Sequence, residues 1–224
     1  MSKNTLVWDI PTRLFHWLLV LSLITQWLTA EVLDNMDWHF YIGYFTLGLI
    51  IFRVVWGVIG TAHARFADLL YSPKNIIAYA RGDNNSPFAG HNPLGGLMVI
   101  LMLVLIGLQA ITGLFSNDDV LHSGPYFSSV SEEWQERMQS WHHDSFDYII
   151  AAVVIHIAAV LYYTKVKKQN LVKAMFTGKK DVPAEQGISS SRLLLAVITI
   201  ALTALFVYWL VEVAPPEPAM DFYY

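Results

Sequence analysis

The stretch WHHDSFDYIIAAVVIHIAAVLYYT, residues 141–164, decides the fold, because it is apolar and long enough to cross a bilayer as one helix. It carries three histidines: His142, His143 and His156. A helix turns 100° per residue, so His142 and His156, fourteen residues apart, share one face at a separation of about 21 Å. His143 points to nearly the opposite side. The stretch therefore predicts a membrane helix with two separated imidazoles on one face.

The composition excludes several protein classes. Of the 224 residues, 55% are hydrophobic and only 14% are charged, whereas soluble domains carry about 25% charged residues. Membrane lipid is therefore an expected partner, and nucleic acid is not. Cysteine is absent, which excludes disulfides, thiolate-bound iron–sulfur clusters and covalently attached c-type haem. Any redox metal must bind nitrogen or oxygen ligands.

Four further apolar segments make the expected fold an all-α membrane protein: Leu14–Ala30, His39–Gly60, Pro93–Phe115 and Arg192–Val213. A cleaved signal peptide is the alternative for the first segment, but Leu28-Thr29-Ala30 is a poor cleavage site. We therefore expect a four-helix transmembrane bundle plus a fifth transmembrane helix. No internal repeat and no soluble domain is expected.

The polar segments connect these helices. Residues 61–92 include an amphipathic piece around Phe66–Arg81, residues 116–140 are read as an acidic loop, and residues 165–180 are rich in lysine. Serines 189–191 are expected to supply N-caps for the fifth helix. The proline-rich tail, residues 214–224, is expected to be extended.

Lys and Arg in the short loops predict the orientation. With the N-terminus inside, the cytoplasmic side receives Lys3, Arg13, Arg65, Lys74, Arg81, Lys165, Lys167, Lys168, Lys173, Lys179, Lys180 and Arg192. The outer loops receive only Arg137. The protein is thus predicted to be a multi-pass protein of a bacterial inner membrane, with its C-terminus outside.

This orientation assigns each histidine a depth. His16 and His156 lie near the inner side, whereas His39 and His142 lie near the outer side. Each pair comes from two helices, as two imidazoles on one haem iron require in a helical bundle. A histidine near an interface is commonly only a polar anchor, but His156 lies deep among apolar residues, where polar groups are costly and tend to be functional. The pattern predicts two non-covalent haem b groups.

Other residues fit this arrangement. Arg53 shares the face of His39 near the inner depth, where a guanidinium suits a haem propionate; snorkelling to the interface is the alternative. Gly43, one turn beyond His39, leaves room for a porphyrin or a close helix. His91 is a candidate for proton exchange with a quinone, with an interfacial anchor as the alternative.

The remaining residues of these types receive ordinary interpretations. Small-residue helix packing is expected of Gly95, Gly96, Gly107 and Gly113. A structural or solvated role is expected of His63, His122 and His143. His143 is the alternative to His142 as a ligand, but its phase argues against it.

The chain resembles the bacterial cytochrome b561 family of di-haem membrane proteins, which includes cytochrome b subunits of nickel–iron hydrogenases. The resemblance rests on Arg13-Leu14-Phe15-His16-Trp17, on His39 followed by Gly43 and Arg53, on Gly90-His91-Asn92-Pro93-Leu94-Gly95-Gly96, and on Ser140-Trp141-His142 with His156 fourteen residues later. It implies haem b with His16, His39, His142 and His156 as axial ligands, and a cofactor-binding role for Arg13. The usual core of the family has four helices. We therefore divide the chain into a di-haem domain, residues 1–180, and a fifth helix with its tail, residues 181–224.

The implied function is electron transfer between a periplasmic redox partner and the membrane quinone pool, as a subunit without its own substrate chemistry. The partner would be a c-type cytochrome or a dehydrogenase or hydrogenase subunit. A basic partner would suit the acidic outer residues Glu31, Asp34, Asp37, Asp118, Asp119, Glu132, Glu133 and Glu136. The alternative is that the outer loops lack Lys and Arg only because of membrane topology. The alternatives are a superoxide:quinone oxidoreductase, which these acidic loops disfavour, and a non-redox membrane scaffold. The fifth helix offers a surface for an oligomer or complex.

Overall fold

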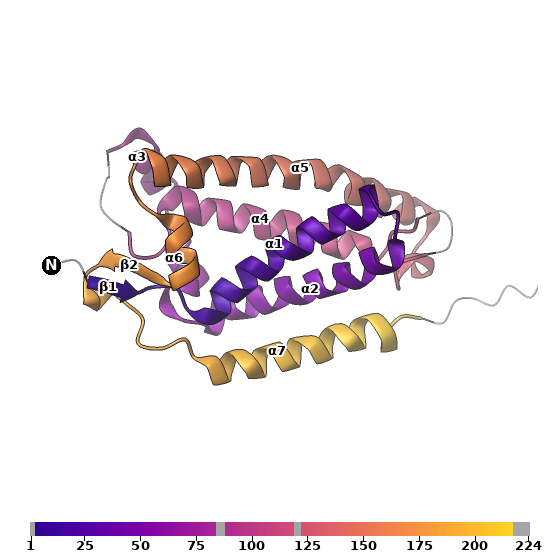
Figure 1. The fold of residues 1–224 in the computed structure, drawn as a ribbon. Helices are drawn as coiled ribbons and strands as arrows, with labels where there is room; N and C mark the ends of the chain where they lie inside the picture. The colour runs from indigo at the N-terminus through magenta and orange to yellow at the C-terminus, as the bar shows by residue number, and fades with distance from the viewer. Residues whose placement is uncertain (1–2, 84–87, 119–121, 217–224) are drawn as a thin grey trace, which may run out of the picture.

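The computed structural model describes residues 3–83, 88–118 and 122–216, and confirms an all-α membrane protein (Figure 1). Within these ranges, five helical segments are long and apolar enough to span a membrane. They are α1 (Ile10–Glu31), α2 (Met36–Ile59), α4 (Pro93–Gly113), α5 (Glu132–Lys165), and α7 (Leu193–Tyr208) with the π-helical turn Trp209–Val213. Such segments adopt helices because lipid offers no partner to backbone polar groups.

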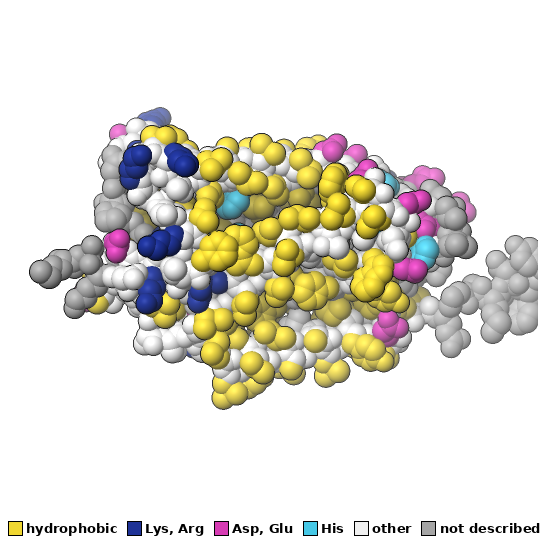
Figure 2. All heavy atoms as spheres, viewed as in Figure 1, with side chains coloured by type: hydrophobic (Ala, Val, Ile, Leu, Met, Phe, Trp, Pro, Cys, Tyr) yellow, Lys and Arg dark blue, Asp and Glu magenta, His cyan; other side chains and the backbone are white. Residues whose placement is uncertain are grey.

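The packing order of the helices leaves α5 without extensive contacts to α1 or α2 among the described residues. α1 packs along α2, α2 packs against α4 and α7, and α4 packs along α5. Among the described residues, α5 makes its extensive helix contacts with α4 and with the short helix α6 (Leu171–Thr177), rather than with α1 or α2. Figure 2 shows a hollow between α5 and α1, with a histidine side chain visible in it.

Helix α5 begins earlier than expected. It starts at Glu132, so the last part of the expected acidic loop, residues 132–140, is helical and that prediction is wrong there. Two acidic residues, Glu132 and Glu133, occupy the first turn, where negative charge is favoured by the helix dipole. An ion pair one turn apart, Arg137 to Glu133 at 2.7 Å, supports the same segment.

A small cap that the sequence did not predict closes one end of the bundle. Strand β1 (Lys3–Leu6) pairs antiparallel with β2 (Lys179–Val182), with Lys3 opposite Val182. Val7, Trp8, Ala174 and Val182 form a buried cluster beneath this pair. The expected domain boundary at residue 180 falls within β2, and the two-domain division stays a prediction. The amphipathic piece is shorter than expected, because helix α3 covers only Pro73–Arg81.

The start of α7 also differs from the expectation. The N-cap position is Arg192, in a left-handed conformation (φ 48°) without a side-chain cap, so the prediction of serine caps is wrong. Ser191 Oγ instead accepts a hydrogen bond from the backbone N of Ile10 at 3.2 Å. Arg192 Nη1 donates to the carbonyl of Ile59 at 3.1 Å, which ties α7 to the end of α2. Most of the tail that was expected to be extended lies outside the described residues.

Charge divides the molecule into two ends (Figure 2). We call one the basic end; its exposed cations include Arg65, Lys74, Arg81, Lys165 and Lys179. We call the other the acidic end; its exposed carboxylates include Asp34, Asp37, Glu132, Glu133 and Glu136, while Asp119 lies outside the described residues. Exposed apolar side chains cover the surface between the ends, as contact with lipid requires. By the distribution of Lys and Arg, the basic end is predicted to be cytoplasmic.

Candidate functional site

Four histidines meet in two pairs across the hollow. At the basic end, His16 of α1 faces His156 of α5, with ring centroids 6.4 Å apart and ring planes 52° apart. At the acidic end, His39 of α2 faces His142 of α5, with ring centroids 6.3 Å apart and ring planes 84° apart. The structure thus brings together the histidines that their depths paired. Their role as ligands stays a prediction.

The spacing of both pairs fits a shared metal ion. A metal–imidazole bond is about 2 Å long and the ring centre lies roughly 1 Å beyond the nitrogen, so two opposed imidazoles place their centres about 6 Å apart. In the part of the chain that the structure describes, no group of three or more His, Asp or Glu residues could hold a bare metal ion. Two imidazoles therefore suit an iron whose remaining ligands come from a porphyrin.

Backbone carbonyls orient both rings of the acidic-end pair. The Nδ1 of His39 lies 3.2 Å from the carbonyl oxygen of Gln26, and the Nδ1 of His142 lies 3.0 Å from that of Gln109. When Nδ1–H donates to a carbonyl, Nε2 keeps its lone pair for a metal. The arrangement selects the tautomer that a ligand requires.

The side chains around His142 belong to the site but were missed in the sequence. Gln109 Nε2 lies 3.1 Å from His142 Nε2, Ser145 Oγ donates to Gln109 Oε1, and Thr112 Oγ1 lies 3.2 Å from His142 Nδ1. A side chain at Gly113 would place its Cβ only 3.1 Å from His142 Cε1. Gly113, which we assigned to ordinary packing, therefore packs against His142 itself. Gln109 was detectable, since an amide within an apolar span is costly.

Gly43 lies close to the support of His39. A Cβ at Gly43 would lie 3.4 Å from Gln26 Nε2, on the neighbouring helix α1. This is an ordinary van der Waals contact, and a role of Gly43 in making room for a porphyrin stays a prediction. Gly48 instead faces Val207 of α7 at 3.7 Å, as ordinary helix packing requires.

In the described part of the chain, the basic-end pair has no such supports. The buried Nδ1 of His16 has no hydrogen-bond partner among the described residues, and His156 is half-buried in an apolar helix. Arg53 is only 2% exposed, its guanidinium lies 5.3 Å from the ring centroid of Phe66, and its Nη1 has no partner in the described ranges. A buried donor without a partner is costly. A propionate carboxylate would satisfy it.

Arg13 is partly committed to the protein itself. Its Nη1 donates to the carbonyl of Phe176 in α6, while its buried Nε has no partner within the described residues. Trp17, one residue after His16, stacks on Phe176 with ring centroids 4.5 Å apart. These contacts hold α6 over the start of α1, beside the basic-end pair.

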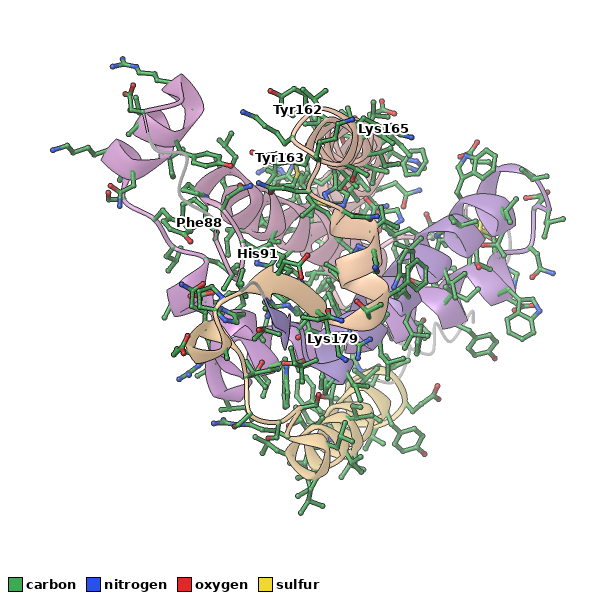
Figure 3. All side chains as sticks on the ribbon, turned by 60° about the vertical axis from the view of Figure 1, so that its left-hand side comes forward. Phe88, His91, Tyr162, Tyr163, Lys165 and Lys179 are labelled. Atoms are coloured by element: carbon green, nitrogen blue, oxygen red, sulfur yellow. The ribbon has the colours of Figure 1, made fainter. Side chains whose placement is uncertain are left out.

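Side chains from three segments gather at the basic end (Figure 3). They are Phe88 and His91 before α4, Tyr162, Tyr163 and Lys165 at the end of α5, and Lys179 of β2. The His91 ring lies 4.5 Å from the ring of Trp8, and its buried Nδ1 has no partner in the described part of the chain. Burial, followed by the positive charges of Lys180 and Arg53, lowers the pKa of His91 to about 3. His91 is therefore a neutral hydrogen-bonding group at neutral pH rather than a proton donor.

Lys180 forms hydrogen bonds with the loop that carries His91. Its Nζ donates to the carbonyls of Phe88 (3.4 Å), Ala89 (2.8 Å) and Gly90 (2.8 Å). Burial lowers the pKa of Lys180 to about 8. This lysine connects β2 to the entrance of α4.

The other histidines have different surroundings. His63 Nδ1 lies 2.9 Å from Asp68 Oδ2, and this hydrogen bond raises the pKa of His63. His122 lies between Asp118 and Asp37, at 2.8 and 2.9 Å. His143 is exposed.

Comparisons with known proteins agree with this geometry. The family model of prokaryotic cytochrome b561 matches residues 7–178. A protein of Rhizobium leguminosarum bv. viciae, named as a probable Ni/Fe-hydrogenase B-type cytochrome subunit, is 25% identical over 80% of this chain and 89% of its own length. Proteins of the same name from Azotobacter chroococcum and Azotobacter vinelandii are 25% and 24% identical, each over 77% of this chain and 86% of their own length. No solved structure matches the chain significantly.

The matched residues contain all four paired histidines and the four helices α1, α2, α4 and α5. Helix α7 lies beyond the match. The chain therefore belongs to the prokaryotic cytochrome b561 family, whose b-type cytochromes carry haem b and transfer electrons in membranes.

Proposed function

We propose that the protein is a di-haem cytochrome b that carries electrons between a redox protein at its acidic end and quinone in the bilayer. The observation that supports this most is the spacing of the two histidine pairs across the hollow, 6.4 Å for His16 and His156 and 6.3 Å for His39 and His142. Each pair would hold one haem b, which supplies reversible one-electron redox chemistry.

The chain's own residues favour electron transfer over substrate chemistry. Two imidazoles at each site leave no open coordination position for oxygen or a substrate. The carbonyls of Gln26 and Gln109 hold the acidic-end imidazoles in one orientation, so they need little rearrangement when the charge changes. Arg53, whose buried Nη1 has no partner among the described residues, would bind a propionate at the basic end. Arg13 Nε, which also has no partner in the described ranges, is a further candidate donor.

The acidic end is the proposed docking surface. Its exposed carboxylates would attract a basic redox protein over a distance of about one Debye length, roughly 8 Å at physiological salt. Because the relatives bear the name of hydrogenase cytochrome subunits, we infer a hydrogenase or dehydrogenase subunit, or a c-type cytochrome, in the periplasm of a bacterium with this protein in its inner membrane. The same carboxylates would repel superoxide, which disfavours the alternative oxidoreductase.

The quinone is assigned to the basic end. His91 offers a buried Nδ1 without a partner in the described ranges, next to the aromatic ring of Trp8. Its neutral imidazole would donate or accept a hydrogen bond at a quinone carbonyl. The proton for quinone reduction would then come from water or another group at this end.

Haem stoichiometry tests the proposal. We expect the purified protein to contain two haems b per chain by the pyridine haemochrome assay, and His156→Ala and His142→Ala to contain about one each. His143→Ala is the matched control, since this exposed neighbour of His142 should leave both haems in place.

Absence of haem from correctly folded wild-type protein would refute the proposal. Loss of a haem from His143→Ala, with both retained by His142→Ala, would refute the ligand assignment. Circular dichroism and size-exclusion chromatography of each variant distinguish lost ligation from lost folding.

A further inference from the structure

The two histidine pairs lie in opposite electrostatic surroundings. At the basic end, Arg53 is buried, and Arg13 and Lys180 are partly buried. At the acidic end the sequence offers only one Lys or Arg residue, Arg137. The Arg137 side chain is 54% exposed and pairs with Glu133 at 2.7 Å. A buried cation therefore accompanies one pair and not the other.

Contacts at the helix ends fix the depth of Arg53. Trp56 Nε1 donates to Asp9 Oδ2 at 3.2 Å, so Trp56 lies level with the N-cap of α1. From this level, Arg53 is about 4.5 Å and His16 about 10 Å further into the bundle, at 1.5 Å per residue. Measured along the helix axes, Arg53 thus lies about one helical turn from the level of His16, whereas about 21 Å of helix α2 separates it from His39.

Among the protein's own carboxylates, Asp9 does not form an ion pair with Arg53 across the described ranges. Asp9 accepts hydrogen bonds from the backbone N of Thr12 (2.6 Å), from Trp56 Nε1 and from Thr61 Oγ1. The charge of Asp9 offsets part of the positive charge, but Arg13 and Lys180 add to it. The positive charges of Lys180 and Arg53 also contribute, after burial, to the lowered pKa of His91.

Hydrogen bonding to the histidine rings would also make the acidic-end haem harder to reduce than the basic-end haem. At the acidic end, both Nδ1 atoms face backbone carbonyls, and such acceptors raise the basicity of the ligand, which favours the oxidised metal. At the basic end, the Nδ1 of His16 has no acceptor among the described residues. His39 and His142 would therefore be stronger donors to a ferric ion than His16.

We propose that Arg53 makes the haem at the basic end the more easily reduced of the two, so that an electron arriving at the acidic end moves downhill to the basic end. This inference rests on the proposed di-haem function. His39 and His142 would hold the haem that gives up one electron, passing from ferrous to ferric, and His16 and His156 would hold the haem that accepts this electron. No bond is made or broken and no proton is required.

The physical basis is Coulombic. Reduction lowers the charge of a haem by one, so a nearby buried cation stabilises the reduced state, and the energy falls inversely with distance. Arg53 therefore acts mainly on the nearer haem. It is a positioning and tuning residue, because it holds no electron itself.

Spectroelectrochemical titration of the purified holoprotein tests the inference. We expect two resolved one-electron waves. The variant His142→Ala, which keeps the basic-end haem, should retain the wave of higher potential, and His156→Ala should retain the lower one. Arg53→Met should lower the equilibrium constant for reduction of the basic-end haem at least tenfold, a shift of about 59 mV for one electron, and should move the other wave much less. Arg53→Lys, which keeps the charge, should preserve most of the potential.

The outcomes separate this inference from the function on which it rests. Wild-type protein without two haems would refute the proposed function. Two haems of equal potential, or a lower potential at the basic end, would overturn the inference and leave the function intact. Equal shifts of both waves in Arg53→Met would also overturn it. If Arg53→Met loses its haem, the order of the two potentials in the wild type still decides whether the basic-end haem is the more easily reduced one.

Discussion

Replacement of Lys180 by methionine should change how the stability of the protein depends on pH. The Lys180 ammonium is partly buried and donates to three carbonyls of the loop before α4. Burial lowers its pKa from 10.5 to about 8. At about 1.36 kcal/mol for each pKa unit, retaining the charge costs the folded state on the order of 3 kcal/mol.

The sign of the effect follows from proton binding. Since the pKa is lower in the folded state, the unfolded chain binds more protons between about pH 8 and pH 10.5, and the free energy of unfolding rises with pH. The cost is fully present below about pH 8 and fades toward pH 10.5. Lys180 should thereby add about 2 kcal/mol to the free energy of unfolding between about pH 7 and pH 9.5.

The assay is denaturant unfolding of the holoprotein in detergent, followed by circular dichroism across this pH range. The difference between wild type and Lys180→Met removes the contributions of all other titrating groups. Lys179→Met, at the exposed neighbouring position in β2, is the matched control and should follow the wild-type pH dependence. Parallel curves for wild type and Lys180→Met would refute the reasoning that this lysine is desolvated.

Two further predictions concern packing. Gly113→Ala, whose Cβ would lie 3.1 Å from His142 Cε1, should weaken haem binding at the acidic end about tenfold or more, as disturbed ligand supports do. The control Gly107→Ala, whose Cβ would lie 3.7 Å from Ile50, should leave haem binding unchanged. Equal haem retention in both variants would contradict the role of Gly113. Asp9→Ala removes the acceptor of Thr12 N, Trp56 Nε1 and Thr61 Oγ1 and should lower the free energy of unfolding by about 3 kcal/mol, against about 0.5 kcal/mol or less for the exposed Asp83→Ala. Similar losses in these two aspartate variants would argue against Asp9 as a buried hub.

The membrane helices were predictable because lipid makes length and apolar composition sufficient. Each expected span corresponds to a helix in the structure, with the largest shift at the start of α5. The depths of the histidines were predictable for a similar reason. A fixed rise per residue converts sequence position into height along the helix, and heights alone paired His16 with His156 and His39 with His142.

The polar ends were not predictable in this way. Strands β1 and β2 are far apart in the chain, and Thr5 Oγ1 donates to the carbonyl of Val182, 177 residues away, at 2.8 Å. Four-residue polar strands carry no periodicity that separates them from loops. Ser191 likewise appeared suited to cap its own helix, but a distant backbone N–H, that of Ile10, occupies its oxygen.

The sequence by itself determined the class of protein, the five spans, and the height and helical phase of each histidine, because these depend on composition and on the regular geometry of one helix. Only the tertiary structure decided which helices are neighbours, which carbonyls orient His39 and His142, that Gly113 contacts a candidate ligand, and that Arg53 is buried without a partner for Nη1 among the described residues. These features depend on lateral packing between segments far apart in the chain, and no periodicity within a single helix encodes that packing.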